Sequence, residues 1–295
     1  MELKTKEVMI LVGLSKSGKT KIAKRIADTT PNSCVISLED MKDRLIQSKP
    51  EKEVTDEEIF NEFYHSIAEN VKEGHNVIVD APNITIEDRK KILDLIKDFD
   101  IYKSCMLIPR PMKDCKKENE ISENPVPKGT ILKQYKEFQV PFMEEGFKRI
   151  YVESKYPKNN IAMDDMMYAE QFWYGETNLN GVELFNHSME TSYKFYNLRK
   201  YEPIYALGAM FHDYGKIKVQ KPDEDGNSRY HNHSSISAYE LISSSPKAYM
   251  LKAAFLANYH MLPYEWTTEE QKEKWKKIFG EEKFQMLLDF HECDK

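Results

Sequence analysis

Cysteine is scarce in this sequence of 295 residues. Its four cysteines show no CxxC pairing; they are Cys34, Cys105, Cys115 and Cys293. This excludes a small disulfide framework and indicates free thiols in a reducing compartment, so we expect a cytoplasmic protein. Long apolar runs are also missing: no stretch reaches the ~18 residues of a membrane-spanning helix, and the amino-terminal apolar segment ends in glycine instead of a cleavage pattern. We expect neither export nor membrane insertion.

Glycine and proline are sparse as well, at 11 and 13 residues, while 40% of the chain is apolar and 31% is charged. These values exclude collagenous, low-complexity and wholly disordered chains. The net charge of −6 excludes a global basic field, so any contact with nucleic acid has to be local. At ~100–200 residues per domain, the length predicts two domains.

The first half of the chain, residues 1–152, alternates short β-branched runs with stretches of helical period. This pattern predicts a parallel sheet with flanking helices, an α/β domain. We predict strands at Glu7–Val12, Cys34–Ser37, Asn76–Asp80, Tyr102–Ile108 and Arg149–Val152, and helices at Lys19–Asp28, Asp56–Lys72, Ile86–Asp98 and Thr130–Phe138. The polar residues 113–128 are predicted to form a mobile lid, which we call the lid segment.

The second half of the chain changes character after a stretch rich in Pro, Asn and Gly, which predicts a linker over 153–180. Residues 181–295 have helical spacing and no strand signal, so we predict an all-α domain. Its expected helices are Glu183–Leu198, Pro203–Phe211, Ser234–Ser243, Pro246–Tyr259, Thr268–Ile278 and Glu281–His291.

The segment GLSKSGKT fits the phosphate-binding pattern G-x-x-x-x-G-K-[ST], with an apolar strand before it and a helix after it. Such a loop directs backbone N–H groups at phosphate oxygens, Lys19 would reach the β- and γ-phosphates, and Thr20 would bind Mg²⁺. We therefore expect ATP or another NTP with Mg²⁺, bound by Gly13, Ser15, Lys16, Ser17, Gly18, Lys19 and Thr20.

Two other strand ends carry groups suited to a phosphoryl acceptor, at the sheet edge where α/β proteins build their sites. Carboxylates there, Glu39 and Asp40, could take a proton from an attacking hydroxyl. The cations there could hold an acceptor phosphate; they are Lys42, Arg44 and Arg89. Asp80 and Asn83 are further candidates for binding the acceptor. Each alone is equally well a helix cap or a surface charge.

Six of the eight histidines lie in the second half of the chain. His187, the adjacent pair His212-Asp213, and Asp294 are separated by long helical stretches. Imidazole plus carboxylate is a ligand set suited to Mn, Fe, Ni, Co or Zn. A buried histidine that only satisfies core hydrogen bonds is the alternative for His187 taken alone.

Residues 6–152 resemble the polynucleotide 5′-hydroxyl kinases and their zeta-toxin-like P-loop relatives. The resemblance rests on GLSKSGKT, ISLEDMK, VIVDAPN with Arg89 downstream, and VPFMEEGFKRIYV. It implies a general base and a phosphate-binding residue in a D-x-x-R pattern, which falls on Glu39 and Lys42, with Asp40 adjacent; the choice between the two carboxylates stays open. The family's lid arginines are replaced here by lysines, including Lys116 and Lys117, which would bind the donor phosphates.

Residues 181–295 resemble the HD phosphohydrolase superfamily, through NHSMETS, AMFHDYGK, YHNHSSISA, LANYHMLPYEW and LLDFHECDK. The resemblance implies metal ligands at His187, His212, Asp213 and Asp294, with His233 and His260 in the places of a second metal's ligands, so one or two ions are expected. Lys216 would neutralise a phosphate, Asp289 is the alternative to Asp294, and His231 is either a proton donor or a surface residue.

Together the two resemblances imply a bifunctional enzyme that heals nucleic-acid ends, preferably of RNA. The first domain would phosphorylate 5′-OH ends, and the second would remove a 2′,3′-cyclic, 2′- or 3′-phosphate, leaving ends for a separate RNA ligase. The expected partners are RNA or DNA strand ends and no membrane. Two alternatives remain: a nucleoside or metabolite kinase fused to a nucleotidase, and a P-loop nucleotide sensor that gates an HD hydrolase.

Overall fold

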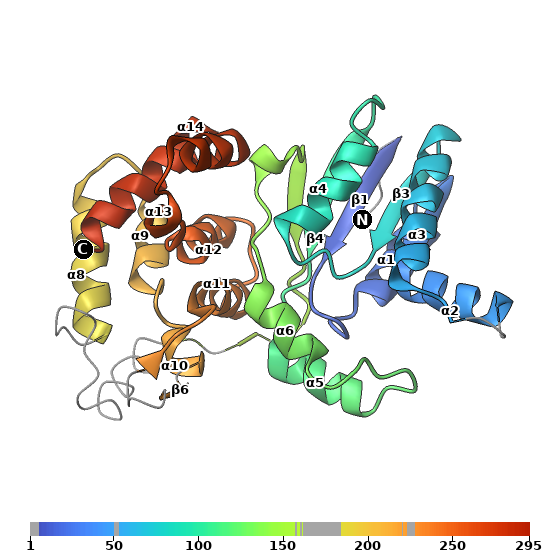
Figure 1. Ribbon diagram of the computed structural model, residues 1–295, viewed down its shortest axis with the longest axis horizontal. Coiled ribbons are helices and arrows are strands. Elements are labelled where there is room, and N and C mark those ends of the chain that lie inside the picture. The colour runs from blue at the N-terminus through green and yellow to red at the C-terminus, as the bar shows by residue number, and fades with distance from the viewer. Residues whose placement is uncertain are drawn as a thin grey trace. The chain divides into compact units, whose positions relative to one another are not determined.

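The computed structural model describes residues 6–49, 53–156, 158–159, 161, 184–219, 221–222 and 228–295 (Figure 1). The chain forms two compact units. The P-loop unit comprises Met1–Ile131 and Gly146–Glu153, and the helical unit comprises Leu132–Glu145 and Ser154–Lys295. Most of the predicted linker, over 153–180, lies outside the described residues.

The P-loop unit is built on a five-stranded parallel sheet with the order β2-β3-β1-β4-β5. The strands are β1 (Glu7–Val12), β2 (Ser33–Ser37), β3 (Asn76–Asp80), β4 (Tyr102–Leu107) and β5 (Arg149–Val152). Every residue of β1 and β3 is buried, as expected for central parallel strands covered on both faces. The predicted parallel sheet is therefore confirmed, and the carboxyl ends of β1 and β3 lie side by side.

The helices of the P-loop unit are α1 (Lys19–Asp28), α2 (Leu38–Ser48), α3 (Asp56–Lys72), α4 (Ile86–Leu95) and α5 (Met112–Glu120). Helix α1 packs on β1, β2 and β3, while α3 packs on β2 and β3 (Figure 1). Capping boxes begin α3 at Thr55 and α4 at Thr85, which fixes where these helices start. Helices α2 and α5 were not predicted, and α5 occupies the first part of the lid segment.

The helical unit consists mainly of α8 (Leu184–Asn197), α9 (Pro203–Met210), α10 (Lys216–Val219), α11 (His233–Ser244), α12 (Met250–Tyr259), α13 (Leu262–Glu265) and α14 (Glu269–Cys293). Helix α12 packs against both α9 and α11, and α8 packs against α9. The two predicted helices at the end form α14, with a kink at Gly280.

The prediction that this part of the chain is purely α-helical was wrong in one place. β6 (Lys221–Pro222) pairs with β7 (Ser228–Arg229) in an antiparallel ladder. Strands of two residues are too short to produce an alternating hydrophobic pattern, so they could not be predicted from periodicity. Within the described part of the chain, no helix is both long and apolar enough to cross a membrane.

The connection between β4 and β5 passes through the helical unit. After α6 (Thr130–Glu137) begins, residues Leu132–Glu145 group with the helical unit, and we call them the inserted segment. Phe142 packs its ring against those of Phe255, Tyr259 and Phe279, at centroid distances of 5.3, 5.9 and 5.3 Å. Asn258 accepts a hydrogen bond from the backbone N–H of Val140 at 2.6 Å. The division thus differs from the expected boundary at residue 152, because β5 follows the inserted segment and returns to the sheet.

Candidate functional sites

The phosphate-binding loop joins β1 to α1 and has the geometry its sequence predicts. Gly18 is the residue before α1 and has a φ of 96°, a left-handed conformation that favours glycine. The ammonium of Lys19 donates to the carbonyls of Gly13 and Leu14, at 3.0 and 2.8 Å, and so curls over the loop. The Ser17 hydroxyl is buried with no hydrogen-bond partner among the described residues. A bound phosphate would supply partners for these groups.

Lys19 is buried, and this desolvation lowers its pKa despite the opposing negative charge of Asp80. Asp80 ends β3 directly beside the loop, and its carboxylate accepts a 2.6 Å hydrogen bond from the Thr20 hydroxyl. Burial raises the pKa of Asp80, while Lys19 and the Thr20 hydrogen bond oppose the rise. Asp80 thus lies beside Thr20, the residue expected to bind Mg²⁺, while its predicted place among the acceptor-binding groups stays a prediction.

Two further predicted acceptor residues hold the fold together. Asn83 is buried, and its side-chain amide donates to the Leu11 and Ala81 carbonyls, at 2.7 and 3.2 Å. Arg89 is fully buried, and its guanidinium donates to the Asn83 and Ile84 carbonyls at 3.2 Å. These side chains fix the loop that follows β3. Binding of an acceptor phosphate by Asn83 and Arg89 stays a prediction; in the structure both side chains are buried and donate to main-chain carbonyls.

The remaining predicted acceptor residues lie on α2, whose first turn is capped by Ser37. Glu39 and Asp40 are exposed there, and Glu39 forms an ion pair with Lys16 of the phosphate-binding loop at 3.5 Å. Both carboxylates are close enough to Asp80 to raise its pKa through their negative charge. Two carboxylates therefore stand in solvent beside the loop, as a general base requires.

The basic groups of α2 are also exposed. Lys42 is exposed one turn into the helix, and Arg44 donates to the Asp40 carbonyl at 3.4 Å. Both lie where they are accessible to a ligand.

Arg110 is a residue of the loop region that the sequence argument did not single out. It follows β4, the strand next to β1, and donates to the Lys16 carbonyl at 3.2 Å and to Glu118 of α5 at 3.1 Å. The Lys16 ammonium in turn donates to the carbonyl of Asn124, in the lid segment, at 2.6 Å. The signal that could have found Arg110 is its position at the carboxyl end of a strand beside β1. The predicted donor-phosphate ligands Lys116 and Lys117 are exposed on α5.

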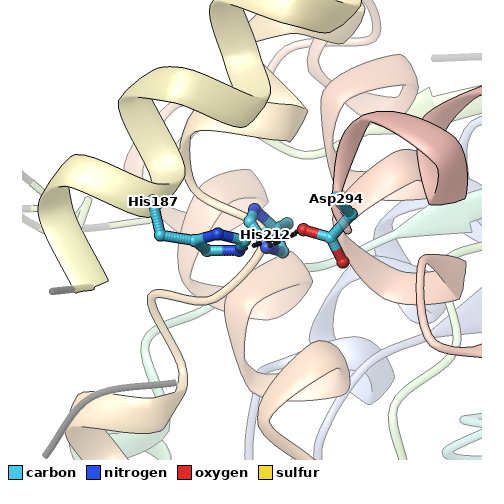
Figure 2. Close-up of side chains that lie close together, drawn as sticks. All are labelled: His187, His212 and Asp294. Carbon is cyan, nitrogen blue, oxygen red and sulfur yellow. Dashed lines mark ion pairs between the residues drawn. The ribbon is translucent and has the colours of Figure 1, made fainter. Parts of the chain in front are cut away.

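The helical unit gathers four histidines and two aspartates at one point, the His/Asp cluster. His187 lies in α8, His212 and Asp213 follow α9, His233 begins α11, His260 follows α12, and Asp294 follows α14. Asp294 Oδ1 lies 3.0 Å from His187 Nε2 and 3.1 Å from His212 Nε2 (Figure 2). The carboxylate of Asp213 lies 3.3, 3.1 and 3.7 Å from the Nε2 atoms of His212, His233 and His260.

Three of these imidazoles are oriented in the same way by the main chain. The Nδ1 atoms of His212, His233 and His260 each lie within hydrogen-bond distance of the carbonyl three residues earlier, at 2.6, 2.8 and 2.9 Å. Donation from Nδ1 leaves the lone pair on Nε2, and the Nε2 atoms face the two carboxylates. Such hydrogen bonds fix ring orientation and increase ligand basicity at metal sites.

The cluster is strongly polarised. Burial would lower the pKa of His212, but the charges of Asp213 and Asp294 raise it to about 10. Burial, with the positive charges of His212 and His233, lowers the pKa of His260 to about 3. Burial would raise the pKa of Asp213, but His212 and Lys216 hold it well below its ordinary range. The two carboxylates thus favour the positively charged form of His212, which lies between them.

A divalent metal ion fits this arrangement. Among the residues that the structure describes, the buried atoms His212 Nε2 and Asp294 Oδ1 have no hydrogen-bond partner and meet only as an ion pair. Ligand atoms of His187, His212 and Asp294 lie within 4.8 Å of one another, as do those of His212, Asp213 and His260. Mixed imidazole and carboxylate ligands suit first-row transition metals.

Close packing brings the α11 histidine to the cluster. A Cβ at Gly215 would stand 2.1 Å from the carbonyl oxygen of His233, so only glycine allows this approach. The Gly215 N–H donates to the hydroxyl of Ser237 in the same helix, at 2.7 Å. A substitution at Gly215 would therefore displace His233 from the cluster.

Three residues of the helical unit had roles that the sequence left open, and the structure shows where each one lies. Asp289, the alternative to Asp294, accepts hydrogen bonds from Lys200 and Tyr201 at 2.8 Å and does not face the cluster. The ammonium of Lys216 lies 2.6 Å from Asp213, at the edge of the cluster. His231 is exposed, two residues before His233.

Comparisons with known proteins concern mainly the P-loop unit. A family model described as an AAA domain matches residues 8–141. No curated protein matches the chain. Together with the parallel sheet and the phosphate-binding loop, the family match fits a P-loop kinase domain. The match ends before the helices that carry the His/Asp cluster.

Among solved structures, a chain from "Structure of the Pnkp1/Rnl/Hen1 RNA repair complex" is similar at 22% identity and a TM-score of 0.39, covering 46% of this chain and 44% of that chain. This chain thus spans less than half the length of that one. A gluconokinase from Sinorhizobium meliloti 1021 is similar at 13% identity and a TM-score of 0.37, covering 52% and 86% of the two chains. The tunicamycin resistance protein of Deinococcus radiodurans is similar at 17% identity and a TM-score of 0.37, covering 58% of this chain and 97% of that chain.

Proposed function

We propose that this protein heals broken RNA ends, with a 5′-hydroxyl kinase in the P-loop unit and a metal-dependent 2′,3′-phosphoesterase of the HD type in the helical unit. The observation that carries the proposal is the presence of two different phosphate-processing sites in one chain. One is a phosphate-binding loop with a buried lysine, and the other is a cluster of four histidines and two aspartates.

In the kinase reaction, the phosphate-binding loop and Lys19 hold the β- and γ-phosphates of ATP. Thr20 and Asp80 would hold Mg²⁺, which neutralises charge on the transferred group. A carboxylate of α2, Glu39 or Asp40, takes the proton of the attacking 5′-hydroxyl. A bond forms between that oxygen and the γ-phosphorus, the bond from the γ-phosphorus to the β–γ bridging oxygen breaks, and ADP leaves. Lys42 and Arg44 are available to hold the acceptor phosphate.

In the esterase reaction, His187, His212, Asp213 and Asp294 would hold a metal ion, and His233 and His260 would extend the site to a second one. Bound metal supplies an activated water and stabilises the departing oxygen. The ammonium of Lys216, beside Asp213, neutralises a non-bridging oxygen of the substrate phosphate. Water oxygen bonds to phosphorus, the P–O bond to the 2′- or 3′-oxygen breaks, and the proton lost by the water passes to that oxygen. A 2′,3′-cyclic phosphate needs this step twice: the first opens the ring to a phosphomonoester, and the second releases inorganic phosphate.

RNA is the substrate that makes both activities useful together, because a 2′,3′-cyclic end requires a 2′-hydroxyl. One site would create a 5′-phosphate and the other would free the 3′-end of phosphate. Those are the two ends that an RNA ligase joins, so the expected partners are RNA ends and a separate ligase.

The test measures both activities on one preparation. Labelled γ-phosphate transfer from ATP to a 5′-OH RNA, a matched DNA and free nucleosides reports the kinase. Release of phosphate from a 2′,3′-cyclic RNA end with Mn²⁺ or Ni²⁺ reports the esterase. Lys19→Ala is expected to reduce transfer at least ~100-fold and spare hydrolysis, and Asp213→Ala is expected to do the reverse.

Three outcomes would contradict the proposal. Label on nucleosides but not on strands would indicate a metabolite kinase, and nucleotide binding without transfer would indicate a sensor. Loss of both activities in either folded variant would show that the sites are not independent. Comparison of Glu39→Gln with Asp40→Asn then identifies the base, since the carboxylate whose replacement leaves the rate unchanged is not it.

A further inference from the structure

Asp294 reaches the His/Asp cluster from the end of a helix. Helix α14 ends at Cys293, and Asp294 lies just beyond it, with its N–H donating to the Phe290 carbonyl at 3.0 Å. Residues at helix ends open more easily than those within the helix. Nevertheless Asp294 places Oδ1 against two imidazoles with its side chain only 7% exposed. Something besides the helix has to hold this carboxylate in place.

The second carboxylate oxygen of Asp294 is bound by a tyrosine. The hydroxyl of Tyr264, in α13, donates to Asp294 Oδ2 at 3.3 Å. The Tyr264 ring packs edge-on against the His291 imidazole at a centroid distance of 4.2 Å. His291 and Asp294 are three residues apart, so the tyrosine contacts the last turn of α14 and the carboxylate beyond it.

Tyr264 is 47% exposed, but the residues on either side of it anchor α13 without contacting the cluster. Two residues later, Trp266 is 5% exposed and stacks on Phe284 of α14 at a centroid distance of 4.6 Å. Pro263, immediately before the tyrosine, is buried in the same helix. The Tyr264 hydroxyl thus approaches Asp294 from α13, which is a different helix from those that position the imidazoles.

We infer that Tyr264 is a positioning residue for Asp294: its hydroxyl holds Oδ2 and turns Oδ1 toward the metal position, so that the carboxylate binds the ion through one oxygen. This inference rests on the metal site of the proposed function. Groups that orient a metal ligand typically contribute 10–100-fold to metal affinity. A tyrosine with a merely structural role would leave that affinity unchanged.

The experiment compares Tyr264→Phe in the full chain with the wild type and with Tyr193→Phe. Tyr193 is a matched control: it lies in α8, six residues after His187, and is 71% exposed. Mn²⁺ is titrated into each metal-free protein and its affinity is measured by calorimetry and by the electron paramagnetic resonance of free Mn²⁺. Amide exchange of the α14 end, with and without Mn²⁺, and the melting temperature of the metal-free protein are measured in parallel.

Tyr264→Phe is expected to weaken Mn²⁺ binding about 10–100-fold and to reduce the protection that Mn²⁺ gives to the end of α14. The melting temperature of the metal-free protein should match that of Tyr193→Phe. Equal Mn²⁺ affinity in Tyr264→Phe and the wild type would overturn this inference alone. Absence of Mn²⁺ binding by the wild type would instead overturn the metal site, and the inference with it.

Discussion

The inserted segment offers a sharp test of how the chain is divided, through the substitution Phe142→Ala. Phe142 is 4% exposed and packs against three aromatic rings of the helical unit. Loss of a buried phenylalanine ring costs about 3–5 kcal/mol. With an m-value of about 2 kcal/mol/M in urea, the unfolding midpoint of the helical unit should fall by roughly 1.5–2.5 M.

Tryptophan fluorescence isolates the helical unit, because all three tryptophans follow residue 153: Trp173, Trp266 and Trp275. Binding of a fluorescent ATP analogue reports the P-loop unit in the same titration. We expect Phe142→Ala to shift the tryptophan transition by this amount and to leave nucleotide binding near its wild-type midpoint.

Phe147→Ala is the matched control. Phe147 is 3% exposed and lies only five residues further along the chain, but it belongs to the P-loop unit. Phe147→Ala should lower the urea midpoint at which nucleotide binding is lost and leave the midpoint of the tryptophan transition unchanged. If Phe142→Ala acts on the nucleotide signal instead, or if both substitutions move both signals equally, the assignment of the inserted segment is refuted.

Two other substitutions test single interactions. Burial raises the pKa of Asp80 above 3.8, so its charge costs stability at neutral pH and the cost disappears as the pH falls toward 4. The melting temperature of Asp80→Asn at pH 7 without nucleotide should therefore be no lower than that of the wild type, and any gain should vanish near pH 4. The affinity for ATP with Mg²⁺, measured from the rise in melting temperature on nucleotide addition, should fall about tenfold or more. Asn258→Ala leaves the buried Val140 N–H without its acceptor and should lower the tryptophan-reported stability by about 1–3 kcal/mol; an unchanged unfolding midpoint would exclude this hydrogen bond as a contributor to stability.

Regular periodicity made most of the P-loop unit predictable. Strands with an apolar β-branched core, such as β1 and β3, are found where the sequence places them. Helix α2 was missed because its amphipathic face buries only Met41, which leaves almost no helical signal. Helix α5 was missed for the same reason: Cys115 is its buried residue, and its polar residues are typical of a loop.

The sites were predictable where residue type dictates the chemistry. The phosphate-binding loop was predictable from its own pattern, whereas the six cluster residues were named together only through the resemblance to the HD phosphohydrolase superfamily. The inward orientation of Asn83 and Arg89 could not be predicted, because a polar side chain after a strand can turn inward to satisfy main-chain carbonyls, and only the three-dimensional path of the loop decides this. Arg110 lies outside the quoted motifs, and Tyr264 lies within LANYHMLPYEW but was given no role there; the contacts of both arise between segments distant in the sequence.

The order of the segments along the chain also determines when the inserted segment can pack during synthesis. The inserted segment is complete at Glu145, but Phe279, one of the rings that covers Phe142, is added 134 residues later. At ~5–20 residues per second, the ribosome needs roughly 7–27 seconds to cover that distance. Throughout this interval the nascent chain carries apolar side chains whose partners do not yet exist. Slower elongation lengthens that exposure, so the yield of folded protein should depend on translation rate and on chaperones that bind apolar segments as they leave the ribosome.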